Sequence, residues 1–207
     1  FNPGGRTSAE LINEAEAKVF KISDDRPSLG GPESVRSLLT KAVERIDVLY
    51  QTKGALTGVS TGFRDIDEIT SGLQASDLII VAGRPSMGKT AFMMNMAESA
   101  VISGGSPVLV FSMEMPSASL VLRMLSSLGR INQSKIRTGQ LGDDDWPRLT
   151  SAVTLLNDKP LFIDDTPALT PGDIRSRARR VAREHGDLGM IVIDYLQLMQ
   201  SATTVEN

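Results

Sequence analysis

Residues 83–90, which read GRPSMGKT, constrain the fold of this chain more than any other stretch. They match the phosphate-loop pattern G-x-x-x-x-G-K-[ST], in which a strand leads into a glycine-rich turn and a helix begins at its end. The apolar run at 77–83 and the helical stretch at 89–103 stand on the two required sides, which argues against a chance glycine turn. The pattern therefore predicts an α/β domain of the phosphate-loop class.

After this loop the chain alternates between apolar runs and helical stretches. Further strands are predicted at 106–114, 160–165 and 189–199, and helices at 116–129, 133–141, 143–158 and 172–185. Thr170 and Pro171 give the last helix a cap and a favoured first-turn proline. This order predicts a mostly parallel sheet covered by helices on both faces.

The region before the loop predicts two helices joined by a linker. A helix is expected at 7–22, and prolines and glycines at 23–33 are typical of a hinge. Residues 34–50 place apolar side chains at helical spacing, namely Val35, Leu38, Leu39, Ala42, Ile46 and Leu49. This apolar face docks either on its own domain or on another surface, and both alternatives stay open at this point.

Composition excludes several classes of function. The chain of 207 residues has 41% hydrophobic and 23% charged residues, which is typical of a soluble globular protein. It lacks cysteine and has one histidine, His185, so thiol chemistry, a Ser/His/Asp triad and a His-rich metal site are not expected. No apolar run reaches the ~18 residues of a membrane helix. Residues 1–7 show no signal peptide, so we expect a cytoplasmic location and no membrane.

A net charge of −3 argues against a generally basic nucleic-acid coat. One helix is nevertheless rich in arginine, with Arg175, Arg177, Arg179, Arg180 and Arg183. A solvated face on a crossover helix explains these residues better than DNA binding, because Ile174, Ala178 and Val181 supply an apolar side.

The phosphate loop supplies the first candidate site residues. Gly83 and Gly88 let backbone N–H groups approach phosphate oxygens, and the helix N-terminus adds positive potential. Lys89 offers a positive charge to the terminal phosphates, and the hydroxyl of Thr90 suits Mg²⁺. The predicted nucleotide-binding residues of the loop are Gly83, Arg84, Pro85, Ser86, Met87, Gly88, Lys89 and Thr90.

Carboxylates follow three of the predicted strands. Asp194 ends the apolar run MIVID, where ligands of open α/β sheets collect, and we expect it to complete a metal site with Thr90. Glu114 follows another strand and is a candidate base for an attacking water. It is equally explained as an acid at a helix start, and Asp164 and Asp165 compete for the same role.

Five stretches in the same order resemble bacterial replicative DNA helicases of the DnaB type, over nearly the whole chain. They are GRPSMGKT, FSMEMP, INQSKIRTGQL, RSRARRVAREHG and IVIDYLQLM. The resemblance implies a RecA-like ATPase domain that binds ATP and Mg²⁺ and forms a homo-hexamer. It also implies 5′ to 3′ movement on single-stranded DNA during fork unwinding, with primase and a helicase loader as partners near the bacterial nucleoid.

The resemblance also assigns roles to single residues. Glu114 and Lys89 become catalytic, Thr90 and Asp194 hold the metal, and Arg123 lies near the nucleotide, although its spacing also fits a structural arginine. Residues 34–50 correspond to the linker helix that docks on a neighbouring subunit. The implied division is 1–22 as the end of an N-terminal domain, 23–58 as the linker and 59–207 as the first part of the ATPase domain.

Residues with three further family roles have no counterpart before Asn207. These are the γ-phosphate sensor, the DNA-facing loops and the arginine finger, so we expect this chain to lack autonomous helicase activity. The alternatives are a RecA-like recombinase, a nucleotide-switch or loader ATPase, and an interaction module without catalysis.

Overall fold

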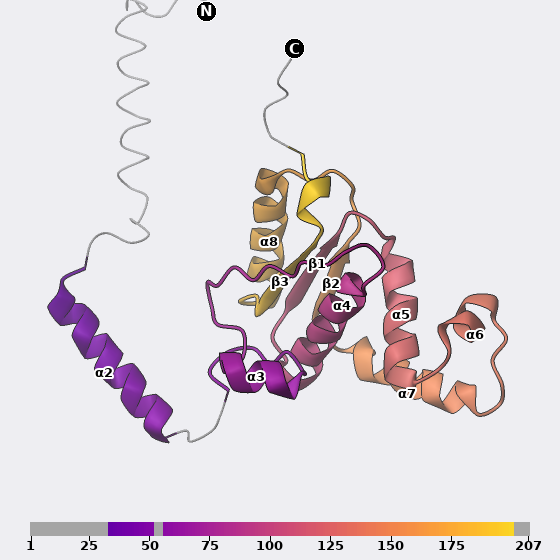
Figure 1. Cartoon of the computed structure of the whole chain (residues 1–207), viewed down its shortest axis with the longest axis horizontal. Coiled ribbons are helices and arrows are strands. Elements are labelled where there is room, and N and C mark those ends of the chain that lie inside the picture. The colour runs from indigo at the N-terminus through magenta and orange to yellow at the C-terminus, as the bar shows by residue number, and fades with distance from the viewer. Residues whose placement is uncertain (1–32, 52–55, 201–207) are drawn as a thin grey trace, which may run out of the picture. The chain divides into compact units, whose positions relative to one another are not determined.

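The structure is a computed structural model that describes residues 33–51 and 56–200 (Figure 1). The helix expected at 7–22 and nearly all of the linker expected at 23–33 lie outside the described residues. The chain divides into two compact units, Phe1–Gly54 and Ala55–Asn207. No helix in the described ranges has both the length and the apolar character that a membrane span requires.

The described part of the first unit is a single amphipathic helix, α2 (Val35–Gln51). Lys41 forms an ion pair with Glu33 at 2.7 Å on its polar side. The apolar residues at helical spacing are all exposed, among them Val35, Leu38, Leu39, Val43 and Ile46. The helix thus presents an apolar face that the described residues leave uncovered.

The second unit is built on a parallel sheet whose strand order is β2-β1-β3 (Figure 1). The strands are β1 (Val108–Ser112), β2 (Leu161–Asp164) and β3 (Met190–Asp194). All five residues of β1 are buried, as expected for a central parallel strand that is covered on both faces. β1 pairs with β3 up to the last residue of each, so that Ser112 stands opposite Asp194.

Helices cover both faces of this sheet, as the sequence predicts. Val108 and Val110 of β1 contribute to one core with residues of α4 (Lys89–Ser99), η1 (Ala100–Gly104) and α5 (Ser117–Gly129). Leu109 and Phe111 contribute to a second core with Ile174 and Ala178 of α8 (Pro171–His185). The alternation follows from the period-two geometry of a strand.

The remaining helices lie around this framework. They are α3 (Arg64–Thr70), α6 (Gln133–Thr138), α7 (Asp145–Asn157) and the 3-10 turn η2 (Leu196–Leu198). Buried Asp145 joins α6 to α7, because it accepts hydrogen bonds from Lys135 at 2.8 Å and Arg148 at 2.6 Å. The apolar side of α8 is buried, while Arg175, Arg179, Arg180 and Arg183 are exposed.

Two strand predictions are wrong. Residues 77–83 form no strand, and Leu78, Ile79 and Ile80 are 84%, 49% and 69% exposed. The final strand ends at Asp194 instead of continuing to 199. In both places the apolar run lacks ladder hydrogen bonds, and beyond Asp194 there is none to be made because β1 has itself ended. An apolar run becomes a strand only where a partner strand is present.

Candidate functional site

The glycine-rich loop has the backbone form that a helix-terminal anion site requires. It enters α4 through Gly88, whose φ of 87° and ψ of 20° lie in the left-handed region. A Cβ at Gly88 would meet nothing within 4 Å, so the backbone conformation and not space calls for glycine. Gly83 packs on Lys89, with 3.4 Å between a Cβ at Gly83 and Cγ of Lys89. Residues 83–88 are exposed, and the first N–H groups of α4 lie at the end of the loop.

The structure brings Thr90 and Asp194 into direct contact. Thr90 Oγ1 donates a hydrogen bond to Asp194 Oδ2 at 2.8 Å, across 104 residues of sequence. Asp194 is only 3% exposed and ends β3, so its carboxylate is fixed at the carboxyl edge of the sheet. The contact places a hydroxyl and a carboxylate together at the start of α4.

These two oxygens fit a magnesium ion that also has phosphate and water ligands. Mg²⁺ prefers oxygen donors and commonly uses few protein ligands beside substrate phosphates. Among the described residues no cluster of three or more His, Cys, Asp or Glu side chains could hold a metal alone. The chemistry of the pair therefore suits a metal that arrives with a phosphate compound better than a dedicated protein cage.

Tyr195 holds the lysine of the loop, a role that the sequence reasoning missed. The ammonium of Lys89 lies 5.1 Å from the centroid of the Tyr195 ring. This is a cation–π distance, and the attraction orients the charge toward the end of β3. The available signal was the position of Tyr195 directly after Asp194, at the strand edge where ligands collect.

Glu114 lies in the loop that joins β1 to α5, beside the end of β3. The N–H of Met113 donates to the carbonyl of Asp194 at 2.9 Å, which extends the pairing of the two strands into the loop. The hydroxyl of Ser112 donates to the carbonyl of Met115 at 2.8 Å. Glu114 is exposed, and its backbone is thus tied to the strand that carries Asp194.

The two competing carboxylates are both engaged by other groups. Asp164 accepts a hydrogen bond from Arg177 at 2.5 Å; burial works to raise its pKa, but this contact and those from Thr166 hold the pKa below the usual value. Asp165 accepts a hydrogen bond from the N–H of Ser117 at 2.8 Å, which is the main cause of its lowered pKa. Across the described residues, no side-chain hydrogen bond or ion pair occupies Glu114.

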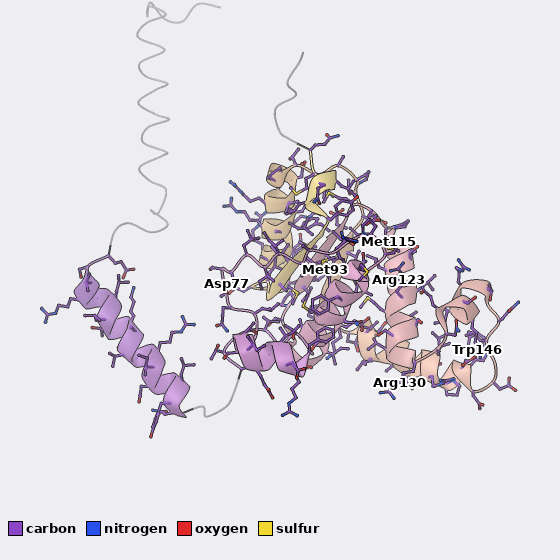
Figure 2. The ribbon with its side chains drawn as sticks, in the orientation of Figure 1. Asp77, Met93, Met115, Arg123, Arg130 and Trp146 are labelled. Carbon is purple, nitrogen blue, oxygen red and sulfur yellow. The ribbon has the colours of Figure 1, made fainter. Side chains whose placement is uncertain are left out.

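Arg123 lies on α5 with part of its guanidinium unsatisfied. Its Nε is buried and has no hydrogen-bond partner within the described structure. Figure 2 draws Arg123 in the region of Met93, from α4, and Met115, from the loop that carries Glu114. A buried unpaired donor is costly, so Arg123 is suited to a ligand oxygen that enters between these elements.

Comparison with known proteins follows the same lines as this geometry. Residues 58–207 match the family described as DnaB-like helicase C terminal domain. The chain is 50% identical over 212 residues to the replicative DNA helicase DnaB of Pasteurella multocida (strain Pm70), covering 100% of this chain and 45% of that protein. It is 44% identical over 192 residues to that of Geobacillus stearothermophilus, with 93% and 42% covered. The chain spans about half the length of these relatives.

Two solved structures share the fold. One is described by its title as an ATPase domain and has a TM-score of 0.78 at 28% identity, covering 86% of this chain and 62% of that one. The other is titled "The Structure Of A DnaB-Like Replicative Helicase And Its Interactions With Primase" and has a TM-score of 0.77 at 28% identity, covering 95% and 45%. These matches confirm the predicted RecA-like fold class, with a short sheet that is not closed.

Proposed function

This chain belongs to the family of DnaB-like helicase C-terminal domains, and from that membership we propose that it forms the ATP-hydrolysing part of a bacterial replicative DNA helicase. The observation that carries the proposal is the hydrogen bond between Thr90 and Asp194, because it joins the phosphate loop to the acidic strand end. Relatives of 44% to 50% identity are named replicative DNA helicases, whereas the recombinase and loader alternatives have no such support.

In this proposal the loop binds the phosphates of ATP. The N–H groups at the start of α4 point at the phosphate oxygens, and the left-handed Gly88 turns the backbone toward them. Lys89 contacts the terminal phosphates, and Tyr195 limits the directions in which its ammonium can point. The other loop residues, Gly83, Arg84, Pro85, Ser86 and Met87, shape the turn around the phosphates.

Thr90 and Asp194 would hold Mg²⁺. Their oxygen atoms are 2.8 Å apart, so both can face one ion or its water shell with little rearrangement. The ion, when bound, supplies positive charge against the β- and γ-phosphate oxygens. Asp194 is fixed by its place at the end of β3 and needs no loop motion to present its carboxylate.

Glu114 would accept the proton of the attacking water. The role needs a carboxylate that is accessible and not already engaged, at the same sheet edge as the phosphates. Glu114 meets these conditions among the described carboxylates that follow strands, since Asp164 and Asp165 are held by Arg177 and Ser117. Arg123 would donate its unpaired Nε–H to an oxygen of the nucleotide.

The wider function follows from the relatives and is proposed for the longer protein. We expect a homo-hexamer that moves 5′ to 3′ on single-stranded DNA and unwinds the fork in the bacterial cytoplasm. The exposed apolar face of α2 is suited to dock on a neighbouring subunit. Primase and a loader are proposed partners, and one structural relative is titled with its interactions with primase. The domain division at 22/23 and 58/59, and the lack of autonomous helicase activity, stay predictions.

The test separates binding from turnover. In this chain, Lys89→Ala should weaken Mg²⁺-ATP binding by at least about tenfold, or ~1.4 kcal/mol, measured by calorimetry. Arg183→Ala removes an equal charge from an exposed position of α8 and serves as the control. In the full-length protein, Glu114→Gln should keep nucleotide affinity and lower kcat on the order of 10²-fold or more. Unchanged binding by Lys89→Ala would remove the phosphate-site assignment.

A further inference from the structure

We propose that Asp165 is a positioning residue for Glu114, because it caps α5 from a neighbouring strand and so fixes the loop that carries the catalytic carboxylate. The inference rests on the proposed function of Glu114. It concerns a residue that touches neither the nucleotide nor the water, and that acts only through the backbone of the loop.

The helix α5 lacks a cap of its own. Its N-cap residue is Pro116, which has no side-chain acceptor, and its first turn contains no acidic residue. The N–H of Ser117 is one of the donors that a helix start leaves unsatisfied. Asp165 Oδ2 accepts this N–H at 2.8 Å from 48 residues away in the sequence. Its negative charge also lies at the positive end of the helix dipole.

The loop is therefore anchored to both strands that flank β1. On one side the N–H of Met113 binds the carbonyl of Asp194, the last residue of β3. On the other side Ser117 binds Asp165, which directly follows β2. Because β1 lies between β2 and β3 in the sheet, these bonds hold the loop from opposite directions. Glu114 stands between the two anchors.

Glu114 depends on this support because its own side chain is exposed and has no hydrogen bond to another described residue. Loss of one anchor lets the first turn of α5 fray and releases the loop at that end. Misplacement of a reacting group by about 1 Å can cost on the order of 10²-fold in rate. The adjacent Asp164 cannot substitute, since Arg177 and Thr166 already bind its carboxylate.

The first test measures loop order and turnover. In this chain, Asp165→Ala should speed amide hydrogen exchange in residues 113–120 by about fivefold, the effect of a lost helix cap. In the full-length protein it should lower kcat by about tenfold to a hundredfold and leave the KM for ATP within about twofold. Asp165→Asn keeps an oxygen acceptor for Ser117 and should restore most of kcat. Asp187→Ala, an exposed acid beyond α8, is the charge-matched control.

The second test places Asp165→Ala in the Glu114→Gln background. If Asp165 acts through Glu114, the second substitution lowers kcat no further, because the group that it positions is already gone. An equal loss in both backgrounds, or no change in exchange and kcat with Asp165→Ala, overturns the inference while the role of Glu114 stands. Full turnover by Glu114→Gln alone instead overturns the proposed function, and this inference with it.

Discussion

Glu98 gives the structure a stability that depends on pH in a predictable direction. It lies on α4 next to α5 and is only 6% exposed. Burial raises the pKa of its carboxyl from 4.5 to about 7, against an opposing effect of the hydrogen bond with Ser127. The folded chain therefore keeps a proton on Glu98 over a range of pH in which the unfolded chain has lost it.

The size and sign of the effect follow from this shift. Between pH 4.5 and about 7 the folded state binds more protons than the unfolded state, so the free energy of unfolding falls as pH rises. At ~1.4 kcal/mol per pH unit, the full shift corresponds to a loss of about 3 kcal/mol, complete near pH 8. This is a large part of the ~5–15 kcal/mol that stabilises a typical domain.

Glu98→Gln isolates the effect, because glutamine keeps the size and a hydrogen-bonding partner for Ser127 but cannot ionise. We expect urea unfolding, followed by circular dichroism, to show the wild-type chain losing about 2–3 kcal/mol from pH 5 to 8. The variant should lack this component, and the difference cancels all titrating groups that the two chains share. Glu68→Gln, on the exposed part of α3, is the control. Parallel pH profiles of wild type and Glu98→Gln would refute the reasoning.

Two further substitutions test the packing between α6 and α7 and the backbone of the phosphate loop. Asp145→Ala removes the buried acceptor of Lys135 and Arg148, and we expect it to lower the free energy of unfolding by about 2–3 kcal/mol in urea titrations; a loss below ~0.5 kcal/mol would contradict the joining role of Asp145. Gly88→Ala should cost about 1–2 kcal/mol through its left-handed backbone alone. Gly104→Ala, where a Cβ also meets nothing, should be near neutral, and equal effects of the two would argue against backbone strain.

The sequence predicted the layers of the fold well and the edges of its sheet poorly. The apolar run within 106–114 became the central strand β1 because burial on both faces can be read from composition. The equally apolar run at 77–83 formed no strand, since strand formation also requires a partner at hydrogen-bonding distance. Pairing is a property of two segments, and the composition of one segment does not report it.

The same distinction holds for the site. The contact of Thr90 with Asp194 was predictable, because a phosphate-loop helix and an acidic strand end meet at one edge of a parallel sheet. The contact of Lys89 with Tyr195 and the cap from Asp165 to Ser117 were not predicted. Both depend on how far a side chain reaches from its strand end, and no local pattern encodes that distance.

The carboxylates that follow strands show what the structure adds to a motif. By sequence, Glu114, Asp164 and Asp165 were competing candidates, since each follows an apolar run. Two of them stabilise the framework: one pairs with Arg177 on α8, and the other caps α5. A carboxylate whose pKa is held low by such contacts is a weaker base, and it would break a structural contact if it took a proton. Glu114 bears neither cost among the described residues, and this favours it as the base independently of any motif.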